Sequence, residues 1–77
     1  MYIKTIPFKK RLVELDMNQK ELADKIGLSL SYVSNLINGR KKVNIDRRLE
    51  LIEILGYEPK NIRRFFIRKR NDIPKVS

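Results

Sequence analysis

Three glycines divide the chain into segments of helix length. Gly27, Gly39 and Gly56 each follow a stretch in which apolar residues recur every three or four positions. Helices commonly end at a glycine, because glycine adopts the left-handed backbone conformation without strain. No stretch alternates apolar and polar residues with the period of a strand. The pattern therefore predicts an all-α fold, a compact bundle of roughly four or five helices.

The expected helix boundaries follow from residues suited to capping. Four side chains are candidate N-caps: Thr5, Asn18, Ser29 and Asn44. The helices are expected over about residues 6–16, 19–26, 30–38 and 45–55, and a fifth begins at Pro59. The fourth should bury Ile45, Leu49, Ile52 and Leu55. Residues 1–4 form a short strand, an arm or a frayed end, and residues 73–77 a loose tail.

The chain length predicts one domain over residues 1–77. A chain of 77 residues buries too little surface for a second core. The core should cover about residues 6–57, and residues 58–77 form a basic C-terminal helix and tail. No apolar run is long enough to span a bilayer or to act as a secretion signal, which predicts a cytoplasmic location, at the nucleoid when DNA is bound.

Charge and missing residue types limit the function. The chain has 18 Lys and Arg residues and 9 Asp and Glu residues, which gives a net charge of +9. A polyanion is the expected partner, nucleic acid first and an anionic membrane second. Cys and His are absent, which excludes disulfides, thiolate or imidazole zinc sites and nucleophile–histidine catalysis. With no glycine-rich phosphate loop either, the sequence does not predict an enzyme, a cofactor, a metal or a small-molecule substrate.

The second and third expected helices have the layout of a helix-turn-helix. Only Gly27, Leu28 and Ser29 separate them, so the chain must turn sharply. The small side chain of Ala23 allows the two helices to approach closely, and Leu28 fills the corner between them. Short amphipathic helices joined in this way occur in many bundles, so the third helix decides the function.

The third expected helix has one apolar and one polar side. A helical wheel puts Val33, Leu36 and Ile37 on the buried stripe and an uncharged polar set opposite: Ser31, Ser34, Asn35 and Asn38. Short amide and hydroxyl side chains suit hydrogen bonding to base edges in the major groove. The residues expected to read bases are Leu30, Ser31, Ser34 and Asn35. Tyr32, on one flank, should contact a phosphate.

The segment from Gln19 to Gly39, QKELADKIGLSLSYVSNLING, resembles the Cro and phage-repressor (Xre-type, lambda-repressor-like) helix-turn-helix family. The family pattern has glutamine at the start of the second helix, alanine four positions later and glycine four beyond that. It has aliphatic residues where this chain has Leu22, Ile26, Leu28, Val33 and Leu36. With the flanking helices, the resemblance covers about residues 6–57. It implies a helical bundle that binds operator DNA and regulates transcription, often as a repressor of phage, mobile-element or bacterial promoters.

The resemblance also implies roles for single residues. It gives Gln19 and Asn38 phosphate contacts and puts Leu30, Ser31 and Asn35 at base-reading positions. Many relatives have long polar or charged side chains at these base-reading positions, so the operator sequence does not follow from the resemblance.

Basic residues cluster after the third expected helix. Arg40, Lys41 and Lys42 lie in the loop, and Arg47 and Arg48 follow at the start of the fourth helix. We expect this loop to bind the DNA backbone. The full set expected to bind phosphate is Gln19, Tyr32, Asn38, Arg40, Lys41 and Lys42. Two other basic groups contribute to the footprint or lie elsewhere: Lys9, Lys10 and Arg11, and Arg63, Arg64, Arg68, Lys69, Arg70 and Lys75.

Phe65 and Phe66 allow two interpretations. Adjacent residues of a helix do not face the same core, so either the fifth helix simply packs on the bundle or one ring contacts a second copy. A homodimer, at least on DNA, fits a near-palindromic site read by two helices about 34 Å apart.

Two alternative functions follow from the same C-terminal segment. An antitoxin-type protein would bind DNA with the helix-turn-helix and a protein partner with the C-terminal segment. A basic RNA-binding module would stack bases on exposed Phe65 and Phe66 rings.

Overall fold

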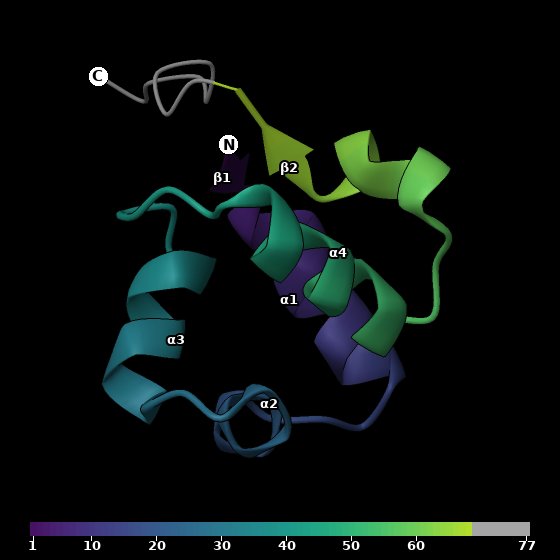
Figure 1. Cartoon of the computed structure of the whole chain (residues 1–77). Helices are drawn as coiled ribbons and strands as arrows, with labels where there is room; N and C mark the ends of the chain where they lie inside the picture. The colour runs from purple at the N-terminus through teal and green to yellow at the C-terminus, as the bar shows by residue number, and fades with distance from the viewer. Residues whose placement is uncertain (69–77) are drawn as a thin grey trace, which may run out of the picture.

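The computed structural model describes residues 1–68 and consists mainly of helices (Figure 1). The elements in chain order are β1 (Tyr2–Ile3), α1 (Thr5–Glu14), α2 (Gln19–Ile26), α3 (Leu30–Ile37), α4 (Ile45–Ile54), the 3-10 helix η1 (Pro59–Arg64) and β2 (Phe66–Ile67). The predicted helical bundle is confirmed, with a small two-stranded sheet added to it. The expectations for Lys69, Arg70 and Lys75 and for the tail over residues 73–77 lie outside the described residues.

One hydrophobic cluster joins the elements, and Ile62 of η1 packs against it. Phe8 of α1 and Leu22 of α2 are fully buried, as is Ile52 of α4. The Phe65 ring packs edge-on against Phe8, with centroids 6.2 Å apart. Within residues 1–68 no polar or charged residue is fully buried, so the fold is held mainly by apolar packing. No helix in this part of the chain combines the length and the apolar character needed to cross a membrane.

Three of the four predicted caps are confirmed. Asn18 and Glu21 form a reciprocal capping box at the start of α2, and Ser29 and Asn44 cap α3 and α4. Thr5 is not a cap, and that prediction was wrong. It is the first residue of α1, and its hydroxyl donates instead to the carbonyl of Ile37 at 2.7 Å. The last carbonyls of a helix lack partners within it, which makes this tertiary acceptor available.

The C-terminal segment differs from the predicted fifth helix. The turns after Pro59 are 3-10, and the chain then extends into β2, which pairs antiparallel with β1. The backbone N–H of Lys4 continues this contact by donating to the carbonyl of Phe65 at 2.6 Å. Of the three alternatives for residues 1–4, the structure shows the short strand. The prediction missed β2, since two-residue strands carry no periodic signal.

Both phenylalanines after η1 are buried. Phe65 is 3% exposed and Phe66 is 1% exposed. A helix here would turn one of the two rings away from the core, but the chain leaves helical geometry at Phe65, so both rings reach the core. Of the two interpretations, the structure shows packing on the bundle, and the two rings offer almost no exposed surface to a second copy.

The buried face of α4 is also shifted from the prediction. Ile52 and Leu55 are buried as expected, but Leu51 joins them and Ile45 and Leu49 are exposed. Ile45 and Leu49, four positions apart, lie along one side of α4 that the core does not cover. Spacing alone did not show which of two overlapping apolar stripes would face inward.

Replacing Phe66 tests the importance of the strand pair to the core. Phe66→Ala should lower the free energy of unfolding by about 3–5 kcal/mol, since it removes a fully buried ring. Urea denaturation measures this change. Ile6, which is 80% exposed, provides the control, and Ile6→Ala should change the stability by less than about 0.5 kcal/mol. Equal small effects of the two substitutions would contradict the core position of Phe66.

Candidate nucleic-acid interface

A tight turn orients α3 against α2. Gly27 ends α2 with a φ of 71°, in the left-handed region that favours glycine. The N–H of Leu28 donates to the carbonyl of Ala23 at 3.0 Å, which closes the turn. Ala23 is buried between the helices. The geometry is that of a helix-turn-helix.

The two sides of α3 differ as the wheel predicted. Val33, Leu36 and Ile37 are buried. On the other side Ser31 is exposed, and Ser34 and Asn35 are partly exposed. At the start of the helix Leu30 and Tyr32 are exposed, which leaves their apolar surface open to contact. The predicted base-reading residues thus share an open surface of α3.

Weak internal hydrogen bonds occupy the polar side of α3. The amide of Asn38, the C-cap residue, donates to the Ser34 hydroxyl at 3.4 Å. Arg40 Nη1 donates to Asn35 Oδ1 at 3.3 Å. Both bonds are long, and DNA can replace them at little cost. The second places a cation beside the side chain with the best geometry for reading adenine.

The basic loop and the start of α3 lie together. Lys41 Nζ sits 5.4 Å from the centre of the Tyr32 ring. Lys42 and Tyr32 line one hollow of about 340 Å³ between the α2–α3 turn and the start of α4. Arg40, Lys41 and Lys42 are all exposed. Gln19 lies at the first position of α2, the end farther from the turn, and is partly exposed.

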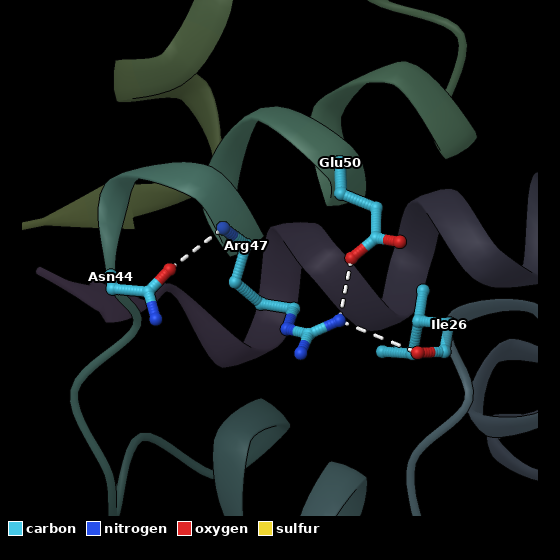
Figure 2. Close-up of polar contacts among 4 residues, drawn as sticks. All are labelled: Ile26, Asn44, Arg47 and Glu50. Carbon is cyan, nitrogen blue, oxygen red and sulfur yellow. Dashed lines mark hydrogen bonds and ion pairs between the residues drawn. The ribbon is translucent and has the colours of Figure 1, made fainter.

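Arg47 has a structural role that the sequence did not suggest. Figure 2 shows its guanidinium between two acceptors, with Nη1 donating to the carbonyl of Ile26 at 3.3 Å and to Glu50 Oε1 at 2.6 Å. Its backbone N–H donates to Asn44 Oδ1 at 2.8 Å. Arg47 therefore joins the end of α2 to α4. Its guanidinium is thus engaged within the protein, and Arg47 lies outside the six residues expected to bind phosphate.

Arg11 is also held within the protein. Its Nε donates to the carbonyl of Leu55 at 2.9 Å, and Nη1 pairs with Glu14 at 3.2 Å. The guanidinium lies 4.9 Å from the centre of the Tyr57 ring. Arg11 thus caps the end of α4, unlike the exposed Lys9 and Lys10 beside it. Sequence patterns gave no signal for the contacts of these two arginines between helices, because the acceptors there are backbone carbonyls brought near by tertiary packing.

Positive charge gathers near the first residue. Burial lowers the pKa of the Met1 ammonium, and Arg48 and Lys42 lower that pKa further. Arg48 is partly buried, and within residues 1–68 its Nε has no hydrogen-bond partner.

No cluster of three acidic, His or Cys residues suited to a metal ion occurs in this described part.

Comparison with known proteins gives one match. A family model described as helix-turn-helix matches residues 8–61, which is well over half of the chain. No curated protein and no solved structure matches the chain. The matched range contains α2, α3 and the basic loop, but it excludes both strands.

The role of Arg47 leads to a stability prediction. Arg47→Gln should lower the free energy of unfolding by about 1–2 kcal/mol, because it removes the charged hydrogen bond from α4 to the carbonyl of Ile26 in α2 and the ion pair with Glu50. Thermal or urea unfolding measures this loss. The control Arg40→Gln removes the same charge from an exposed loop and should change the stability by less than about 0.5 kcal/mol. Unchanged stability in Arg47→Gln would contradict this structural role.

Proposed function

The chain belongs to the helix-turn-helix family of the Cro and phage-repressor type, whose domains bind DNA, and we propose that it is a sequence-specific transcriptional repressor. In this proposal α3 enters the major groove of an operator. The regulated promoters belong to a phage, a mobile element or a bacterial chromosome. Domains of this family are typically non-catalytic.

The division of α3 into two sides carries this proposal. Its aliphatic side is buried, which fixes the helix rigidly on the bundle. Its outer side offers Ser31, Ser34 and Asn35, whose hydroxyl and amide groups match the donors and acceptors of base edges. Leu30 supplies an apolar group suited to a thymine methyl. A merely solvated helix face would more often carry Lys and Glu.

The proposed phosphate contacts surround this helix. Arg40, Lys41 and Lys42 leave its C-terminal end as exposed cations, and cations bind the backbone without regard to sequence. Tyr32, Asn38 and Gln19 add polar groups at the flanks. These contacts would fix the depth and orientation of α3 in the groove.

We further propose that two copies bind one operator. Two reading helices about 34 Å apart would recognise inverted half-sites one turn of DNA apart. Phe65 and Phe66 do not supply the contact between the copies, since both are buried.

The alternatives differ in what supports them. Burial of Phe65 and Phe66 removes the stacking surface on which the RNA-binding interpretation depended. An antitoxin-type protein would use the same DNA-binding surface and add a protein partner for residues 58–77. The repressor proposal needs no such partner, so we prefer it.

Selection of bound sites from random duplexes tests the proposed function. At a fixed salt concentration we expect enrichment of one motif with two inverted half-sites, centred about 10 base pairs apart. Equal recovery of all duplexes, or stronger binding to RNA of the same length, would contradict sequence-specific DNA recognition.

Single substitutions separate base reading from phosphate binding. Asn35→Ala should reduce preference at one base pair by about 1–3 kcal/mol and leave binding to unrelated duplexes nearly unchanged. Lys42→Gln should weaken binding to all duplexes alike. Fluorescence anisotropy with matched operator and random duplexes measures both effects. Equal losses on the two duplexes for Asn35→Ala would contradict its role in base reading.

A further inference from the structure

A second basic site lies at the strand pair. Lys4, Arg63 and Arg68 line one hollow of about 240 Å³, together with Met1, Phe66 and Ile67. All of these residues lie outside the range that matches the helix-turn-helix family, residues 8–61. Properties common to that family therefore give no reason for this hollow. We call it the strand hollow.

The charged groups at the strand hollow share one sign. Its three ionisable side chains are cationic, and among residues 1–68 no Asp or Glu lines it. None of the three ion pairs within this described part involves Lys4, Arg63 or Arg68. Arg63 and Arg68 are exposed, and Lys4 is partly exposed. Like charges held together without counter-charges repel one another, so an anion between them would be stabilising.

The fold holds these cations together from distant parts of the sequence. Antiparallel pairing sets Ile3 opposite Phe66 and Tyr2 opposite Ile67, and this register brings Lys4 to the end of η1. The backbone bond from Lys4 to Phe65 fixes that position. The buried ring of Phe66 anchors the strand on the core. The backbone that carries the side chains of the strand hollow is therefore held in place by strand pairing and by the buried Phe66 ring.

The strand hollow adjoins the basic loop after α3. The N–H of Val43 donates to the carbonyl of Met1 at 2.7 Å, and Met1 also lines the hollow. Lys42, next to Val43, does not line the strand hollow but the separate hollow of about 340 Å³ beside Tyr32. A Cβ added at Gly39 would lie 3.5 Å from the carbonyl of Ile3, so the end of α3 also approaches β1 closely. Positive charge thus continues from the loop to the strands.

We propose that the strand hollow binds a phosphate of the DNA backbone beyond the base pairs that α3 reads. This inference rests on the proposed function, since it extends the footprint of the same bound duplex. Two guanidinium groups can present paired N–H donors to phosphate oxygens, and the Lys4 ammonium adds a third charge. The hollow would hold one phosphate group and carry no base preference.

Two adjacent arginines of η1 provide a matched test. Arg63 lines the strand hollow, whereas Arg64 lies 5.1 Å from the centre of the Tyr57 ring and lines a different hollow with Lys10 and Arg11. Arg63→Gln and Arg64→Gln change the net charge equally. A general effect of charge should therefore appear in both variants, and a local phosphate contact only in the first.

The measurement is the salt dependence of operator binding by fluorescence anisotropy. Arg63→Gln should weaken binding about five- to tenfold at roughly 0.1 M salt and reduce the slope of log K against log salt by about 1. In the double variant Lys4→Gln with Arg63→Gln, the slope should also fall by only about 1, because both side chains contact the same phosphate. Arg64→Gln should keep the wild-type slope. Thermal unfolding of each variant confirms that the fold is retained.

Phosphate ethylation interference locates the contact. Ethylation of one backbone position outside the α3 half-site should hinder the wild-type chain and Arg64→Gln but not Arg63→Gln. Identical slopes and identical interference patterns for Arg63→Gln and Arg64→Gln would overturn the inference. The proposed function would still hold in that case if Asn35→Ala reduced the preference for operator DNA. If the wild-type chain shows no sequence preference at all, the proposed function itself fails.

Discussion

The burial of one side of α3 is the constraint on which the interface depends. Val33, Leu36 and Ile37 pack into the core, and this packing determines which side chains remain outside. The ends of the helix are fixed separately. Ser29 and the turn at Gly27 hold the first end, and Thr5 binds the carbonyl of Ile37 at the last. A helix fixed at both ends holds its exposed side chains in place, so the proposed binding of DNA by α3 would cost little conformational entropy.

Some cations of this chain are engaged within the protein and are not free to bind a polyanion. Arg11 and Arg47 each donate to a carbonyl at the end of a helix and pair with a nearby glutamate, so Arg11 joins α1 to α4 and Arg47 joins α4 to α2. Such pairs are partly exposed, and each contributes little as an ion pair alone. Their value lies in satisfying backbone acceptors that would otherwise face no donor. Net charge therefore overstates the number of groups available to a polyanion.

Sequence patterns predicted the local features well and the tertiary ones poorly. The capping box at Asn18, the turn at Gly27 and the two sides of α3 were predictable because each depends on residues a few positions apart. The strand pair and the burial of Phe66 depend on contacts between opposite ends of the described chain, and the role of Thr5 depends on a contact with Ile37, 32 residues away. No periodic signal records such contacts. The candidate base-reading residues were thus predictable, whereas the strand hollow required coordinates, because Lys4 and Arg63 are neighbours only after folding.

The pairing of β1 with β2 has a consequence for the synthesis of this protein. Ile3 and its partner Phe66 are almost the first and last of the described residues, so the pair cannot form until the ribosome has released the second strand. Long-range contacts of this kind also form slowly, since they close a large loop. The helices can assemble as they emerge, but the strand pair beside the end of α3 forms last. A nascent chain would therefore acquire its finished DNA-binding surface only after translation has passed β2.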